Sequence, residues 1–91
     1  MKLPSACPSC NSKLKVKSLY CENCGTTVDG SYEMPILALL NEKKQDFILE
    51  FIKSSGSLKK MSKHLKLSYP TVRNLLDEII NDIKAIETSI K

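Results

Sequence analysis

"LSYPTVRNLL", residues 67–76, carries the features of a helix start followed by an exposed recognition surface. Ser68 is a favourable N-cap because its hydroxyl can accept an otherwise unpaired backbone N–H, and Pro70 suits the first turn, where its missing N–H needs no partner. Val72 and Leu76 follow at helical spacing and predict the buried side of a helix. The side chains that fall away from this stripe can reach a partner: Tyr69, Thr71, Arg73 and Asn74.

The sequence from residue 41 onward is helical in pattern, and a residue suited to N-capping precedes each segment. The three predicted helices run from Asn41 to about Ser54, from Ser57 to near Leu65, and from Ser68 to about Ile90. Lys66 occupies the turn before the last helix, where glycine is usual; a left-handed lysine there costs on the order of 1 kcal/mol. The pattern predicts a three-helix helix-turn-helix without a wing and with an extended third helix.

Positive charge is concentrated on the predicted helix-turn-helix. The span from Lys53 to Arg73 contains six lysine or arginine residues and no acidic residue, which is the footprint expected for contact with nucleic-acid phosphates. We assign phosphate contacts to Ser57, Lys59, Lys60 and Lys63. We assign base reading in the major groove to Tyr69, Thr71, Arg73 and Asn74. Arg73 suits a guanine and Asn74 an adenine, although exposed lysines also serve only to solvate helices, and trihelical units also bind proteins.

The N-terminal segment contains two cysteine pairs of equal spacing: Cys7-x2-Cys10 and Cys21-x2-Cys24. Each pair can form a knuckle presenting two sulfurs, and we expect an intervening hairpin to bring the pairs together around one structural Zn²⁺. Asn11 and Gly25, which follow the pairs, suit a backbone with positive φ. Rubredoxin-like iron would use the same four thiolates. A redox dithiol is less well matched, and catalytic zinc would need an open coordination position. His64, the single histidine, is expected to be a partly exposed helix residue.

Two segments around the second cysteine pair predict strands. "KLKVKSLY", residues 13–20, alternates, so Leu14, Val16 and Tyr20 should share the covered face of a half-buried strand. "TTVDGSYE", residues 26–33, predicts a second strand with a turn or bulge at Asp29-Gly30.

The third predicted helix is longer than a helix-turn-helix needs. Its apolar residues step by three and four to the end of the chain: Tyr69, Val72, Leu76, Ile79, Ile83, Ile86 and Ile90. This is a heptad seam, and its far end has no obvious partner. We therefore predict a homodimer through Ile79, Ile83, Ile86 and Ile90, which would pair two reading helices. The alternative is packing against the chain's own "MPILALL" segment, residues 34–40.

Composition and chain start favour a small globular protein of the cytoplasm. The chain has 91 residues, 42% hydrophobic and 26% charged, so its core is marginal without a metal or oligomerisation. The start "MKLPSACPSC" has no apolar run before its first cysteine, and "MPILALL" is too short to span a bilayer. We expect no signal peptide and no membrane segment. Lacking paired carboxylates, a phosphate loop or a nucleophile–base pair, the sequence predicts no enzyme.

Almost the whole chain resembles a family of small, mainly bacterial proteins defined by a zinc ribbon and a helix-turn-helix. The residues that carry the resemblance are "CPSC" (7–10), "CENCG" (21–25), "YEMP" (32–35) and "LSYPTVRNLLDEI" (67–79). The helix-turn-helix is also similar, more weakly, to the promoter-reading region of sigma factors. The resemblance implies a role associated with transcription.

Together these features predict a zinc ribbon at residues 1–33, a packed apolar connector at 34–40 and a trihelical helix-turn-helix at 41–91. The function that they favour is that of a transcriptional regulator that binds double-stranded DNA. The alternative is an adaptor that docks on transcription-machinery proteins through its ribbon or its apolar helical tail.

Overall fold

The structure is a computed structural model that describes residues 3–90, with only the backbone described at Ile90. The chain divides between Leu39 and Leu40 into two compact units. We call the N-terminal unit the ribbon module and the C-terminal unit the helical module. None of the helices described is both long enough and apolar enough to cross a membrane.

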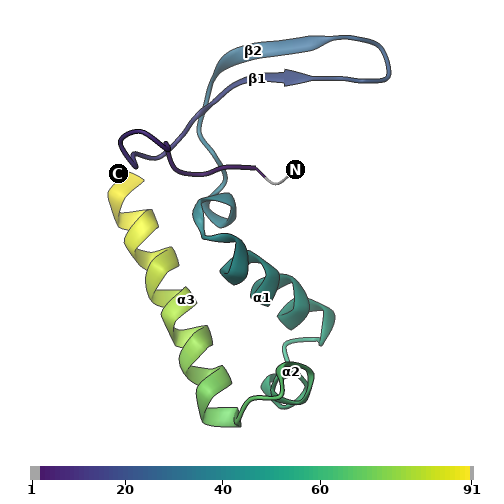
Figure 1. The fold of residues 1–91 in the computed structure, drawn as a ribbon, viewed down its shortest axis with the longest axis vertical. Helices are drawn as coiled ribbons and strands as arrows, with labels where there is room; N and C mark the ends of the chain where they lie inside the picture. The colour runs from purple at the N-terminus through teal and green to yellow at the C-terminus, as the bar shows by residue number, and fades with distance from the viewer. Residues whose placement is uncertain (1–2, 91) are drawn as a thin grey trace. The chain divides into compact units, whose positions relative to one another are not determined.

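The helical module consists of α1 (Glu42–Lys53), α2 (Leu58–Leu65) and α3 (Tyr69–Ile90), with α2 lying where α1 ends and α3 begins (Figure 1). The predicted helices and their caps are confirmed. Each cap oxygen accepts a backbone N–H three residues later: Asn41 Oδ1 from Lys44 at 2.9 Å, Ser57 Oγ from Lys60 at 3.2 Å, and Ser68 Oγ from Thr71 at 3.3 Å. Local side-chain chemistry therefore sets where each helix begins.

Both turns of the helical module use left-handed backbone conformations. Ser55 and Gly56 have φ of 61° and 76° between α1 and α2. Lys66 ends α2 with φ 57° and ψ 39°, and the next N–H, from Leu67, donates to the carbonyl of Ser62 at 3.1 Å. Lys66 thus adopts the conformation that glycine usually supplies, and the turn keeps its geometry at the cost of backbone strain.

All three helices contribute to one hydrophobic core, joined by Leu40, the residue before the N-cap of α1. Its buried members are Leu40, Phe47, Met61, Val72 and Ile79. Val72 and Met61 are the most completely enclosed, at 0% and 1% exposure. Leu67, in the turn between α2 and α3, is 42% exposed.

The far half of α3 packs within the helical module itself. Ile79 is buried in the core, and Ile83 and Ile86 are half-buried against it; the side chain of Ile90 lies outside the described residues. The reason for predicting a dimer, that these isoleucines had no partner, does not hold for the first three. Lys44, in the first turn of α1, also links α1 to the far half of α3. It forms ion pairs with Asp82 and, at 3.3 Å, with Glu78.

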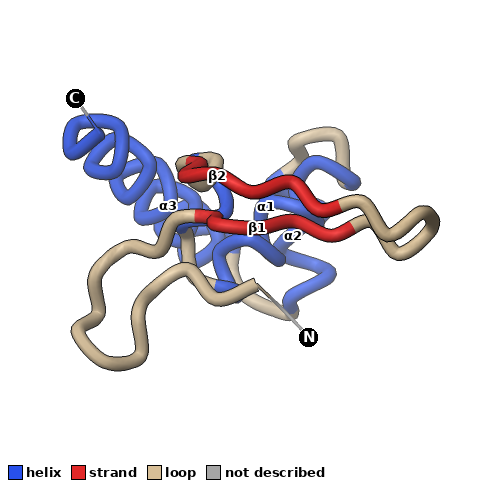
Figure 2. The backbone as a smooth tube through the Cα atoms, turned by 90° about the horizontal axis from the view of Figure 1, so that it is seen from above, coloured by secondary structure: helices blue, strands red, loops and turns tan. Residues whose placement is uncertain are grey.

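The ribbon module contains an antiparallel hairpin of β1 (Val16–Tyr20) and β2 (Thr27–Tyr32), followed by a short 3-10 helix at Ile36–Leu39 (Figure 2). Tyr20 pairs with Thr27, but Val16 pairs with Tyr32, so one strand carries an extra residue. This irregularity lies beside Gly30, as the sequence predicts. The Tyr32 ring covers Gly30 so closely that a Cβ there would lie 2.7 Å from it.

The prediction of a half-buried strand is wrong for most of β1. Val16 is its one partly covered residue, and Tyr20 is 66% exposed. All of β2 is exposed as well. A sheet of two strands has two open faces, and the ribbon module has few apolar side chains with which to cover them.

Candidate nucleic-acid interface and metal-binding residues

The exposed basic residues of the helical module gather on α2 and the turn after it. The side chains of Lys59, Lys60, Lys63 and Lys66 are exposed, and none of them makes an ion pair within the described residues. Lys53, at the start of the acid-free span, by contrast has a partner, since its Nζ lies 3.4 Å from Glu50 Oε1. These four lysines are therefore available to an external anion.

Ser57, for which the sequence predicts a phosphate contact, also caps α2. Its hydroxyl caps α2 and accepts the N–H of Lys60, and the residue is half-buried. The hydroxyl accepts from a backbone donor and keeps its own O–H, so an anion near Ser57 could accept hydrogen bonds from that O–H and from the remaining N–H groups of the first turn of α2.

The side chains expected to read bases lie on the exposed start of α3. Tyr69, Thr71, Arg73 and Asn74 are all exposed, whereas Val72 between them is buried. Alternation of this kind is what a helix with one face on a core and one face toward a partner requires. The Thr71 hydroxyl is hydrogen-bonded to Ser68 Oγ at 2.7 Å, so its methyl group is the more available contact.

Arg73 has a partner on its own helix. Its Nε lies 3.5 Å from Asp77 Oδ1, one turn further along α3, and both side chains are about half exposed. An exposed pair of this kind contributes little to stability. It limits the rotamers of Arg73, and an external ligand of the guanidinium has to compete with Asp77.

The two cysteine pairs have the same local geometry. The N–H of Asn11 donates to the carbonyl of Cys7, and that of Gly25 donates to Cys21, each at 2.8 Å. Asn11 and Gly25 have φ of 61° and 78°, as the sequence predicts. Each pair is therefore folded as a knuckle that suits two-sulfur coordination of a metal.

A hydroxyl accompanies the second cysteine of each pair. Cys10 Sγ lies 3.3 Å from Ser12 Oγ, and Cys24 Sγ lies 3.0 Å from Thr26 Oγ1. The hydrogen bond with Ser12 lowers the pKa of the Cys10 thiol, and that with Thr26 lowers the pKa of Cys24. Both thiols are thereby shifted toward the thiolate form that binds metal.

The expectation that a hairpin between the two pairs brings them together is wrong. Residues 16–20 between the pairs form the extended strand β1, whose partner β2 follows the second pair. The loop before β1 and the loop between β1 and β2 consequently lie at opposite ends of the hairpin (Figure 2). No group of three or more histidine, cysteine or acidic side chains within residues 3–90 is placed to hold a metal. Each knuckle fits two ligands of a zinc ion, but the four sulfurs do not form one tetrahedral site in this arrangement.

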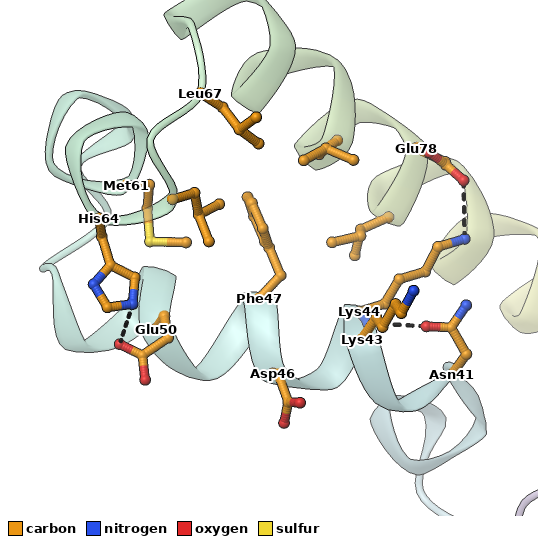
Figure 3. A pocket seen from close by; sticks show the side chains of 13 residues that line it. Asn41, Lys43, Lys44, Asp46, Phe47, Glu50, Met61, His64, Leu67 and Glu78 are labelled. Carbon is orange, nitrogen blue, oxygen red and sulfur yellow. Dashed lines mark hydrogen bonds and ion pairs between the residues drawn. The ribbon is translucent and has the colours of Figure 1, made fainter.

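The helical module also contains a pocket that the sequence pattern does not predict. A cavity of about 610 Å³ lies between α1, the α2–α3 turn and α3. Figure 3 shows Phe47 within it, flanked on one side by His64, whose Nε2 lies 3.9 Å from Glu50 Oε2, and on the other by the ion pair of Lys44 with Glu78. Helical periodicity identifies the apolar faces of the three helices but not the space left where they meet.

Comparison with protein families gives two matches that together cover most of the chain. The model described as "Domain of unknown function (DUF2089)-HTH" matches residues 40–86, more than half of the chain, and "DUF2089 zinc ribbon" matches residues 7–38. They confirm the resemblance to a family that joins a zinc ribbon to a helix-turn-helix, and the cysteine pairs of such a ribbon indicate zinc binding. Neither curated proteins nor solved structures include a match.

Proposed function

Because the chain belongs to the DUF2089 family, with its zinc ribbon and helix-turn-helix-type domain, we propose that it is a transcriptional regulator that binds specific sequences in double-stranded DNA. Nucleic-acid binding is what a domain of this type indicates. In this proposal α3 enters the major groove while α2 contacts the phosphate backbone. The proposal assigns no catalysis to the chain and locates it in the cytoplasm.

The observation that carries the proposal is a set of four exposed lysines that form no ion pair within residues 3–90, next to the exposed start of α3: Lys59, Lys60, Lys63 and Lys66. Lysines that pair with phosphates release condensed counterions, so they supply affinity that falls with salt and carries little sequence preference. Specificity would come from Arg73 on a guanine and Asn74 on an adenine, with Tyr69 and Thr71 beside them.

The test is to select, from random duplex DNA, the sequences that the zinc-loaded protein binds. The selected site is then titrated with protein at several salt concentrations. Arg73→Ala or Asn74→Ala should weaken binding to the selected site by about 1–3 kcal/mol and relax preference at one position. Asn81→Ala, on the exposed side of α3 two turns further along, is the matched control and should change neither quantity.

The phosphate contacts have their own signature. Lys59→Ala, Lys60→Ala and Lys63→Ala should weaken binding to all sequences alike, each reducing the salt slope by about one. Lys84→Ala, an exposed lysine at the far end of α3, serves as the control. Random DNA that yields no enriched sequence would contradict the reading role of α3.

We propose one zinc ion per chain, held by Cys7, Cys10, Cys21 and Cys24; the two knuckles, which lie apart in the structure described above, would have to come together around it. Soft thiolate donors favour this assignment, although the same set also accepts iron. Metal analysis with native mass spectrometry tests it: one zinc on a single chain, lost when either pair is changed to serine, supports the proposal. One zinc shared by two chains, or bound iron, contradicts it.

A second candidate is an adaptor that docks on transcription machinery through the ribbon. It is favoured by the exposed apolar side chains of the hairpin, among them Leu19, Tyr20 and Val28. An adaptor should bind DNA weakly and without sequence preference, so the selection experiment separates the two candidates.

The homodimer through α3 stays a prediction. Sedimentation of the same protein tests it.

A further inference from the structure

The apolar cavity of the helical module has the size and shape of a small-ligand site. Its volume of about 610 Å³ lies within the range of roughly 300–1,000 Å³ typical of such pockets. Side chains from α1, α2, the turn and α3 form its walls, so it is a hollow between three elements and not one exposed helix face. The apolar walls comprise Phe47, Met61, Leu65, Leu67, Leu75 and Ile79.

Two leucines at the mouth of this cavity make an occupant favourable. Leu65 and Leu67, on either side of Lys66, are 37% and 42% exposed. Their contact with water is unfavourable by about 25 cal/mol per Å² of apolar surface, and a cavity lined by apolar groups holds water poorly. A molecule that covered both leucines and filled the space above Phe47 would remove this apolar surface from water.

The charges at the rim indicate the chemical class of the occupant. Lys44 is paired with Glu78 and Asp82, and His64 Nε2 lies 3.9 Å from Glu50 (Figure 3). Lys43 and Asp46 add one charge of each sign. A ligand with a carboxylate would meet Asp46, Glu50 and Glu78 at this rim, and one with an ammonium group would meet Lys43 and Lys44.

From these features we infer that the cavity binds a neutral, predominantly apolar small molecule. The ligand lies along Phe47, with Leu65 and Leu67 on one side and Leu75 and Ile79 on the other. Affinity comes from burial of apolar surface, and a rim that carries charges of both signs selects against charged head groups. The site is independent of DNA binding and does not require that function.

The experiment uses the full zinc-loaded chain and the neutral fluorophore N-phenyl-1-naphthylamine, which brightens in apolar surroundings. We expect saturable binding of one probe per chain. Leu67→Ser should weaken it by roughly tenfold or more, since it removes apolar contact area from the wall. Leu49→Ser is the matched control, because Leu49 is 59% exposed on α1 and lies outside the cavity; it should leave the affinity unchanged.

Competition and spectroscopy complete the test. 1-Dodecanol should displace the probe better than dodecanoate or dodecylammonium, which carry the same chain with a charge. Amide signals of Leu65, Leu67 and Leu75 should shift when the probe is added to the unmodified chain, a result that does not depend on a variant folding. Three outcomes would each overturn the inference. They are absence of saturable binding, an equal loss of affinity in the two serine variants, and loss of bound probe in proportion to self-association of the chain.

Discussion

The helical module and the ribbon module are stabilised in different ways. In the helical module, five buried side chains from four successive segments form one core, with Val72 and Met61 fully enclosed. In the ribbon module, the strands are almost entirely exposed, and the order comes from backbone hydrogen bonds around each cysteine pair. Burial of apolar surface stabilises the first module without assistance, whereas local turns alone leave the second marginal.

This difference shows how a chain of 91 residues supports two modules. The apolar residues available are enough for one core, and the helices use most of them. The ribbon depends on its thiolates instead, since binding of a structural metal can replace the free energy that a core would supply. Four experiments test this division.

The largest effect is expected from metal removal. A strong chelator, or Cys7→Ser together with Cys21→Ser, should unfold the ribbon module, because structural zinc supplies on the order of 10 kcal/mol of free energy coupled to folding. Hydrogen exchange should show loss of protection at β1 and β2 with protection of α1 and α3 retained. If the helices lost protection in parallel, the two modules would not be stabilised separately.

A substitution in the core should destabilise the helical module and not the ribbon module. Met61→Ala should lower the free energy of unfolding of the helical module by about 2–5 kcal/mol, because it leaves a cavity among fully buried neighbours. Urea unfolding followed by far-ultraviolet circular dichroism measures it. Leu49→Ala, an exposed leucine of α1, should stay within about 0.5 kcal/mol of the unmodified chain. Equal losses for the two variants would contradict the core described above.

A change at the turn should be smaller and of opposite sign. Lys66→Gly should raise the free energy of unfolding by about 1 kcal/mol, because glycine adopts φ near 57° without strain. The same variant should lower the salt slope of DNA binding by about one if Lys66 meets a phosphate. Stabilisation with an unchanged slope would leave Lys66 a turn residue only.

The smallest effect concerns the ion pairs of Lys44. Its hydrogen bond with Asp82, and then its contact with Glu78, raise its pKa above the ordinary value of 10.5. Because the folded state holds this proton more tightly, the pairs stabilise the module below pH 10.5 and lose their effect as the pH rises beyond it.

Lys44→Met should therefore be less stable than the unmodified chain at pH 7, and the difference should shrink above pH 10.5. Thermal unfolding across this range measures it. Lys43→Met, at the exposed neighbour of Lys44, should show no such convergence. A difference that stayed constant with pH would assign the effect of Lys44 to packing.

The features that sequence predicted well are those determined within a few residues. Asn41, Ser57 and Ser68 cap their helices as expected because an N-cap bond spans only three residues. Asn11, Gly25 and Lys66 have positive φ for a similarly local reason. The order of ribbon and helix-turn-helix also follows from short motifs, and the family matches confirm it.

The features that sequence could not predict depend on which distant segments meet. Alternation in residues 13–20 identified a strand, but it did not show that its partner follows the second cysteine pair, which separates the pairs. The heptad pattern of α3 identified an apolar face, but a periodic face does not reveal whether its partner is another chain or, as for Ile79, its own core. The cavity and the Lys44 ion pairs arise only when the helices pack together.

The two cysteine knuckles also have an evolutionary consequence. Residues 7–12 and 21–26 share one backbone pattern, with the same carbonyl accepting from the same position and a hydroxyl two residues after the second cysteine. Asn11 stands where Gly25 stands in the other copy. Because each unit of six residues closes through its own hydrogen bonds, it can be duplicated or moved by recombination without carrying a hydrophobic core along. A metal-binding half-site of this kind contains its whole geometry within six residues, and the second half-site can come from another place in the same chain.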